Sequence, residues 1–309
     1  MCDIEAEIKK AILELKKTKN IQEWFKNIDD SIITDENIIK CIKNCKSPVE
    51  ISEKDDKIQE KIKTIFNAFT LFKPQETRIL ILGQDPYPNA ERAHGLAFSF
   101  GDNKIPADDS LLNIFKAIKA YKENKTFDTV NVEEIKGNIK KKIQPWNTNL
   151  KTWAGNNGIL LLNTALTYKE NEKHFNAWNP FIKQIISNLI DNMDKNNKLA
   201  VFLWGVPAQN LFYEAINENE KLKESFKDFI KVYTKYSKNQ KGIVGKILIE
   251  SYCYQKDNLK IFLTSHPSKQ GFWRGFKTIA PNHFDCCDKF LKINGKKTWF
   301  DFPEKNEKH

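Results

Sequence analysis

The stretch RILILGQDPYPNAERAHGLAFSF, from Arg78 to Phe100, changes from apolar to polar within a few residues. It opens as a short apolar run up to Leu82, and Gly83 then leads into Gln84, an acid, two prolines and a tyrosine. An apolar run bounded by turn residues is typical of a buried parallel strand. Polar residues that directly follow such a strand belong to the loops where ligands bind in open α/β sheets. The stretch therefore predicts a strand and one edge of a binding site.

Three further apolar runs have the same character. They are GILLLN (158–163), LAVFLW (199–204) and LKIFLT (259–264). Segments with helical periodicity separate them, among them residues 110–122, with Ser110 as the expected cap, and residues 180–193. Strands that alternate with helices favour a parallel sheet covered on both faces. We therefore predict a three-layer α/β/α sandwich around a central four-stranded parallel sheet.

Residues 1–75 have the pattern of helices. In the first of them, apolar residues recur at helical spacing, at Ile4, Ile8, Ala11, Ile12 and Leu15. We expect this segment to be a helical lead-in of the same domain that residues 76–303 form.

An insertion at about 221–257 lengthens the connection between the last two predicted strands. It carries nine lysines against four acids, and aromatic residues are interleaved with them. Basic and aromatic residues together can grip a nucleic-acid backbone and stack on bases. The same composition also suits an ordinary insertion whose aromatics pack on the domain. The aromatic residues are Phe226, Phe229, Tyr233, Tyr236, Tyr252 and Tyr254.

Composition narrows the class of protein. The net charge of +10 favours a polyanionic partner. Six cysteines occur without a Cys-x-x-Cys pair, which indicates free thiols in a reducing compartment. The sequence has no N-terminal apolar signal segment and no run of eighteen apolar residues. We therefore expect an intracellular protein.

Chemically active side chains follow three of the four predicted strands. A carboxylate (Asp85), an amide (Asn163) and an imidazole (His266) stand at or just beyond the strand ends. Each alone suits a structural role, as a turn residue, a helix cap or a loop residue. Because the carboxyl ends of parallel strands share one edge of the sheet, their joint placement favours a common site.

Five motifs occur in a fixed order: GQDPYP, AHGLAFS, LLLNTALT, FLWG-x-x-AQ and HPSKQGFWRGF. Together they resemble the mainstream uracil-DNA glycosylases, over roughly residues 60–212 and 259–303. The resemblance implies a monofunctional DNA glycosylase that flips uracil out of DNA, hydrolyses its N-glycosidic bond and leaves an abasic site in base-excision repair. It implies neither a metal nor another cofactor.

The resemblance also implies roles for individual residues. Asp85 orients and activates the attacking water, and neutral His266 donates a hydrogen bond to the uracil carbonyl. Four residues bind the base. Asn163 pairs with the uracil edge, Phe98 stacks on the ring, Tyr87 excludes a methyl group at C5, and Gln84 shapes the pocket and water site. The implied DNA contacts are Ser110, Gly205, Ser268, Gln270, Phe272, Trp273 and Arg274.

Departures from the family pattern concern DNA handling. Pro88 replaces a histidine of most relatives, and Val206 replaces the serine that usually follows Gly205. Gln270 stands where the family carries a leucine wedge that enters the duplex, and the nearby aromatics Phe272 and Trp273 either substitute for it or pack on the domain. The acids Asp108 and Asp109 lie in the loop that normally presses on phosphates.

The expected partner is uracil-containing DNA, single- or double-stranded, and the expected state is a monomer. Further candidate partners are a DNA-mimicking inhibitor protein, whose contact surface the altered loops affect, and a replication partner. Two alternatives stay open: a glycosylase for a modified pyrimidine in antiviral defence, and a DNA-binding or replication-associated scaffold with little catalysis. Tyr87, Phe98 and Asn163 argue against the first, and the presence of both Asp85 and His266 argues against the second.

Overall fold

A mostly parallel sheet forms the centre of the computed structural model. The structure describes residues 3–106, 109–143, 145–194, 196–239, 253–268, 275–293 and 298–300, with backbone alone for 235–239. Five strands among these residues pair in the order β2-β1-β3-β5-β4. Their bounds are β1 Ile79–Gly83, β2 Ile159–Asn163, β3 Leu199–Trp204, β4 Cys253–Lys256 and β5 Leu259–Thr264.

The four predicted strands are present within one residue of their expected bounds, and they are parallel to one another. All residues of β1, β2 and β3 are buried, as expected where helices cover both faces of a parallel sheet. Gly83 pairs with Asn163, and Leu82 pairs with Leu203, so the ends of β1, β2 and β3 are level. The predicted three-layer α/β/α architecture is confirmed.

The prediction of four strands was one short. The fifth, β4, runs antiparallel to β5 at the edge of the sheet. Its sequence, CYQK, has no apolar run, and its residues alternate between exposed and half-buried. A short edge strand of this kind has no distinct sequence signal, because only one of its sides is paired and little of it is buried.

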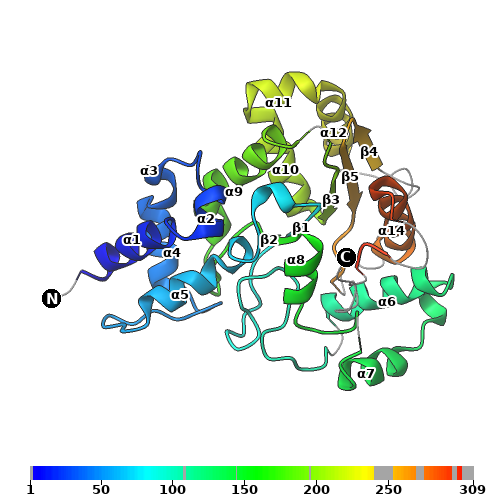
Figure 1. Ribbon diagram of the computed structural model, residues 1–309, viewed down its shortest axis with the longest axis horizontal. Coiled ribbons are helices and arrows are strands. Elements are labelled where there is room, and N and C mark those ends of the chain that lie inside the picture. Colours follow the sequence, from blue (N-terminus) through cyan, green and yellow to red (C-terminus); the bar gives the residue numbers. More distant parts are fainter. Residues whose placement is uncertain are drawn as a thin grey trace, which may run out of the picture.

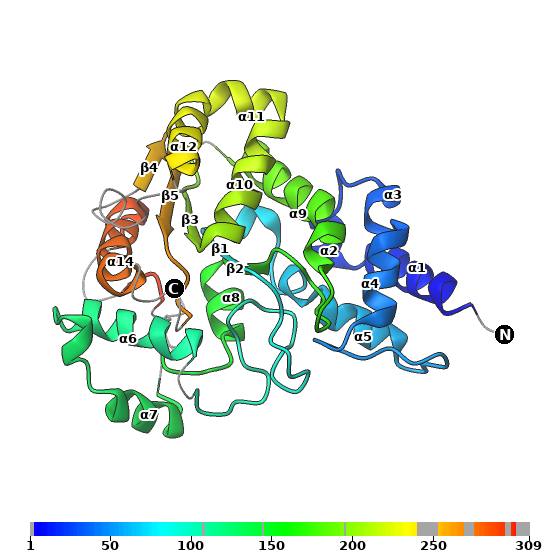
Figure 2. The same ribbon diagram turned by 180° about the vertical axis from the view of Figure 1, so that it is seen from behind.

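Helices cover both faces of the sheet (Figures 1 and 2). One face carries α9 and α10, with α3 and α4 packed on the outer side of α9; the other carries α6, α8 and α14. The helices before β1 are α1 Ile4–Leu15, α2 Lys19–Trp24, α3 Asp30–Ile33, α4 Glu36–Asn44 and α5 Ile58–Ile65. Those after it are α6 Ser110–Lys122, α7 Val132–Lys140, α8 Lys151–Asn157, α9 His174–Asp191, α10 Val206–Glu218, α11 Glu220–Ser225, α12 Lys227–Asn239 and α14 Lys277–Leu291. Short 3-10 turns are η1 Asn67–Phe69, η2 Pro74–Glu76 and η3 Phe127–Thr129.

Two helix predictions need correction. The bounds of α6 are as expected, but its cap is Asp109, whose carboxylate accepts the N–H of Leu112, and Ser110 is the first helical residue. The helix predicted over 180–193 is α9, which begins six residues earlier, at His174. Proline is favoured in the first turn of a helix, so Pro180 suggested a start there, whereas the structure has it inside the helix.

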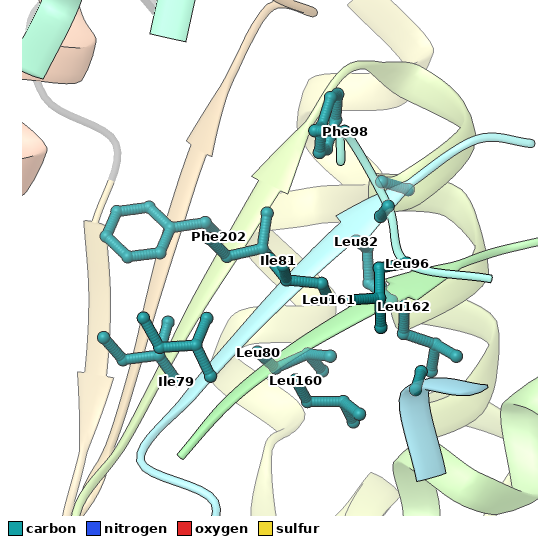
Figure 3. Close-up of a cluster of buried hydrophobic side chains, with 14 of the residues drawn as sticks. Ile79, Leu80, Ile81, Leu82, Leu96, Phe98, Leu160, Leu161, Leu162 and Phe202 are labelled. Carbon is teal, nitrogen blue, oxygen red and sulfur yellow. The ribbon is translucent and has the colours of Figure 1, made fainter. Parts of the chain in front are cut away.

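Aromatic side chains join the helices to the sheet. Beneath α14, the rings of Phe202 and Phe262 stack with centroids 4.9 Å apart. Figure 3 shows the apolar side chains of β1 and β2 around this sheet, with Phe98 at the arrowhead end of the strands. On the other face, the ring of Phe25, which follows α2, lies 5.3 Å from the ring of Phe181 in α9. One cluster of buried apolar residues extends from the first helix to Phe300. We therefore propose that residues 1–75 belong to the same domain as the sheet.

The insertion packs on the domain through its aromatic residues. Figures 1 and 2 show α11, α12 and β4 together beside α10 and β5. Phe226, Phe229 and Tyr233 are buried, and Phe229 lies 6.2 Å from Phe212 of α10, between ring centroids. These three rings are therefore not available to stack on nucleic-acid bases. Tyr252 and the side chain of Tyr236 lie outside the described residues. Within the part of the chain that the structure describes, no helix has the length and apolarity needed to cross a membrane.

Truncating Phe229 tests whether the insertion is part of the core. Phe229→Ala should lower the free energy of unfolding by about 3–5 kcal/mol, the usual cost of removing a buried phenylalanine. Val232→Ala, one turn away and 40% exposed, is the matched control and should change it by no more than about 0.5 kcal/mol. Urea denaturation followed by circular dichroism measures both. Equal, small effects would contradict the packing of the insertion.

Candidate active site

The predicted site residues come from four neighbouring strands. In the sheet order β2-β1-β3-β5, Asn163 ends β2, Gln84 and Asp85 follow β1, Gly205 follows β3, and His266 lies two residues beyond β5. Because these strands are parallel, all of these residues lie at the carboxyl edge of the sheet.

The surroundings of His266 fix both the tautomer and the charge of its imidazole. The backbone N–H of Ser268 donates a hydrogen bond to Nδ1 of His266 over 3.0 Å. A nitrogen that accepts a hydrogen bond carries no proton, so the proton of the neutral ring is on Nε2. Burial lowers the pKa of His266 to about 4. At neutral pH the ring is therefore an uncharged donor through Nε2.

Neighbouring elements hold the His266 loop in place. In α6, Asn113 donates from Nδ2 to the carbonyl of Pro267 over 2.7 Å. In α10, Gln209 donates from Nε2 to the carbonyl of Thr264 over 2.9 Å. Gly205 has a φ of +96°, and a Cβ there would lie 3.0 Å from the Cβ of His266. A side chain at this position would be strained and would press on the imidazole.

Phe98 is next to the imidazole. Its ring centroid lies 5.8 Å from that of His266 and 5.4 Å from that of Trp204. Its φ is +61°, a left-handed conformation that costs a non-glycine residue about 1–2 kcal/mol. Backbone hydrogen bonds on both sides stabilise it, from Ala97 N to Leu161 O and from Phe100 N to Thr148 O. Such strain is typical of functional sites in which a side chain must point one way.

Asn163 and Phe98 meet over Gly83. A Cβ on Gly83 would collide with Oδ1 of Asn163 and would lie 3.4 Å from the ring of Phe98. Glycine thus lets the amide and the aromatic ring approach the backbone closely. Asn163 is only 6% exposed, and its side-chain amide forms no hydrogen bond with another described residue. Since buried amides are normally paired, this amide is available to a ligand.

Tyr87 borders the same region. Its hydroxyl donates to the carbonyl of Phe98 over 3.3 Å, and its ring packs edge-on against Phe100 with centroids 5.1 Å apart. Its carbonyl accepts a hydrogen bond from the Ser47 hydroxyl over 2.5 Å. Burial raises the pKa of Tyr87. The ring is therefore a neutral, fixed wall.

Gln84 and Asp85 line a cavity of about 360 Å³ at the end of β1. The carbonyl of Gln84 accepts hydrogen bonds from the Thr164 hydroxyl (2.7 Å) and the Ala165 N–H (3.0 Å), which ties the loops after β1 and β2 together. Solvent reaches Asp85, yet the surrounding protein raises the pKa of its carboxyl through desolvation. A raised pKa makes this carboxylate a stronger base.

The structure describes only some of the residues that we expect to contact DNA. Ser110, Gly205 and Ser268 lie at the start of α6, the start of α10 and the His266 loop, and Pro88 is exposed. Asp109 caps α6 and lies 3.9 Å from the Arg92 guanidinium, which offsets part of its charge. Outside the described residues are Asp108, Gln270, Phe272, Trp273 and Arg274.

Several residues that position the site gave no functional signal in the sequence. Asn113 and Gln209 read as ordinary polar residues of amphipathic helices, although Asn113 holds a carbonyl of the His266 loop and Gln209 holds the last carbonyl of β5. Ser99 accepts the Leu150 N–H and is hydrogen-bonded to Nε2 of His94, which fixes the loop that carries Phe98. These positioning residues are identified only when the tertiary structure shows which loops are neighbours. Within the described part of the chain, no three His, Cys, Asp or Glu side chains cluster as metal ligands.

Burial of histidines predicts a pH response. The pKa is lowered to about 4 for His94 and His266 and to about 3 for His283, mainly by desolvation. In the unfolded chain these histidines have their ordinary pKa of about 6.5. Below that pH they are protonated in the unfolded chain but still neutral in the folded one, so the unfolded chain binds more protons. Stability should therefore fall as the pH is lowered from about 6.5 towards 4.

Two measurements test this prediction. Urea denaturation at pH 7.5 and pH 5 should give a lower free energy of unfolding at pH 5. NMR spectra should show the His266 ring signals, assigned by comparison with His266→Gln, unchanged between pH 8 and 5. Titration of that ring with a midpoint above about 6 would contradict its neutral state.

Known proteins resemble this chain in sequence and fold. The family model described as Uracil DNA glycosylase superfamily matches residues 69–287. A uracil-DNA glycosylase of Borreliella burgdorferi strain ZS7 is 30% identical over 282 residues, which cover 89% of this chain and 96% of that protein. One from Salmonella agona is 34% identical over 240 residues, covering 76% and 77%. The crystal structure of a mimivirus UNG variant in complex with UGI has a similar fold, with a TM-score of 0.52 and 19% identity over 90% of this chain and 87% of that one. The chain belongs to the uracil DNA glycosylase superfamily and is an enzyme of the glycosylase class.

Proposed function

We propose that this enzyme removes uracil from DNA by hydrolysing the bond between the base and deoxyribose. The observation that carries the proposal is the neutral imidazole of His266, which has its donor on Nε2 and an aromatic ring, Phe98, beside it. The partnerless amide of Asn163 borders the same ring across Gly83. A donor, an amide and a stacking surface together suit a pyrimidine with carbonyl groups.

Selection of uracil would use three contacts. The ring stacks on Phe98, and Asn163 pairs with the ring N–H and a neighbouring carbonyl. Tyr87 stands against C5, where the methyl group of thymine would clash. Because Tyr87 is held by Phe98 and Phe100, it cannot easily move aside for such a group. Exclusion by a fixed wall is an effective source of specificity.

Bond cleavage would separate charge between two sides of the site. As the N1–C1′ bond breaks, its electron pair goes to the uracil ring and positive charge develops on the sugar. The Nε2–H of His266 stabilises the anion at the uracil carbonyl, and Asp85 stabilises the cationic sugar. Asp85 also accepts a proton from the water whose oxygen bonds to C1′, so that uracil leaves and an abasic site remains.

Reaching the base requires that it leave the helical stack, which costs a few kcal/mol. Contacts with the base and with phosphates must supply that free energy. The net charge of +10 favours binding to the DNA backbone. Binding of a DNA-mimicking inhibitor protein or of a replication partner stays a prediction. The monomeric state stays a prediction as well.

A base panel tests the proposal. The protein is incubated with single-stranded and duplex oligonucleotides that contain uracil, thymine, cytosine or 5-hydroxymethylcytosine, and abasic sites are then cleaved with alkali and counted. We expect release of uracil alone. Release of another base would indicate a modified-pyrimidine glycosylase, and DNA binding without release would indicate a scaffold.

Asp85→Asn tests the catalytic role of the carboxylate. The change removes the base and the negative charge while keeping the shape, so single-turnover cleavage should fall by about 10²- to 10⁴-fold. Affinity for uracil DNA, measured by fluorescence anisotropy, should change little. Asp56→Asn, at an exposed acid before α5, is the matched control and should cleave normally. Near-normal turnover of Asp85→Asn would contradict the assigned role.

A further inference from the structure

The lining of the cavity beside Asp85 does not include Phe98, Asn163 or His266. One wall is the segment that follows β2 and enters α9, including Phe175, and the opposite wall is the first turns of α10. Gln84 and Asp85, which follow β1, also line it. Its volume of about 360 Å³ lies within the range of small-ligand pockets. Of its lining residues, only Gln84 and Asp85 have a role in the reaction proposed above.

The two side walls of the cavity expose apolar surface. Phe175 is 43% exposed and Val206 is 46% exposed, and both line the cavity with Pro207. They are among the few large apolar side chains of the described residues that remain so exposed. An accessible aromatic ring and aliphatic side chains in the lining of one cavity suit a flat ligand.

The polar groups of the cavity favour a neutral ligand with a hydrogen-bond donor. Oδ1 of Asn179 is shielded from solvent and has no hydrogen-bond partner among the described residues. Besides Asp85, the acids that line the cavity are Glu172 and Glu214, and Lys173 lines it as well. Glu172 pairs with Lys169 and His174, and Glu214 lies 3.9 Å from Lys183. With three acids against one lysine in the lining, the cavity repels a phosphate, whereas an uncharged ring is not repelled.

Hydrogen bonds to neighbouring side chains hold both walls of the cavity. On the α10 side, Asn210 accepts a hydrogen bond from the hydroxyl of Tyr233 in α12 over 2.8 Å, so the insertion braces this wall. On the α9 side, the Thr167 hydroxyl is hydrogen-bonded to Nδ1 of His174 (2.9 Å) and accepts from Nε1 of Trp178 (2.8 Å). A preformed cavity loses little free energy in ordering when a ligand binds.

We propose that this cavity binds the nucleobase next to the extruded uracil, stacked on Phe175. The proposal rests on the proposed function, because the sugar that reacts at Asp85 is covalently joined to the neighbouring nucleotides. One of these neighbouring nucleotides must therefore lie close to Asp85, which also lines the cavity. An unpaired base has a flat face for Phe175 and N–H groups that can reach Asn179, and its phosphate can stay outside, away from Glu172 and Glu214.

Substitution of Phe175 tests the proposal in steady-state cleavage of a single-stranded uracil oligonucleotide. Stacking of one base on an aromatic ring corresponds to about 5- to 150-fold in affinity. Phe175→Ala should therefore raise KM by a factor in that range and leave kcat within about twofold, because the contact is the same before and during reaction. Phe175→Trp should keep the wild-type KM. Val232→Ala, a similarly exposed apolar residue on α12, is the control for general surface effects.

Oligonucleotides that lack one base identify the nucleotide involved. A tetrahydrofuran residue replaces the nucleotide on either the 5′ or the 3′ side of uracil. With the wild type, one of these two substrates should raise KM by the same factor as the change Phe175→Ala does on the intact oligonucleotide. With Phe175→Ala, the same substrate should raise KM no further.

Two outcomes would overturn the proposal. One is an unchanged KM for Phe175→Ala, and the other is a rise in the KM of the wild type that is the same for the 5′ and the 3′ tetrahydrofuran substrates. If the wild type released no uracil from any oligonucleotide, the proposed function itself would fail, and that result is distinct from both.

Discussion

The hydrogen bond from the Ser268 N–H to Nδ1 of His266 is the interaction on which the chemistry of the site depends. It places the proton of the imidazole on Nε2, and burial keeps the ring uncharged at neutral pH. Were the ring rotated or protonated, it would offer a different set of donors to the carboxyl edge of the sheet. The surrounding contacts serve this arrangement, because Asn113 and Gln209 hold the backbone on either side of the loop.

The fold brings the other groups to this imidazole through close backbone approaches. Level ends of β1 and β2 put Asn163 beside Gly83, where only glycine leaves room for the amide. Phe98 reaches the same point in a strained conformation that hydrogen bonds on both sides stabilise. Local strain of this kind is offset by the burial of the sheet, whose first three strands are buried along their length.

Much of this could be predicted from the sequence, since apolar runs and strand-end polar residues have direct signals. The bounds of α6, the four parallel strands and the shared edge of Asp85, Asn163 and His266 are examples. What failed depends on tertiary contacts. β4 buries too little to leave a pattern, and the composition of the insertion leaves a DNA grip open beside core packing until Phe229 is seen against Phe212. The tautomer of His266 and the cavity beside Asp85 depend on which loops are neighbours, which no local pattern encodes.

The most direct measurement is a crystal structure of the enzyme with an oligonucleotide that contains 2′-fluoro-2′-deoxyuridine, in which the glycosidic bond resists cleavage. The base should be extruded and stacked on Phe98, with Nε2 of His266 and the amide of Asn163 each about 3 Å from uracil oxygen or nitrogen atoms. The carboxylate of Asp85 should face C1′ from the other side of the sugar. A bound uracil that makes no hydrogen bond to Nε2 of His266, or that lies away from Asn163, would contradict the central claim.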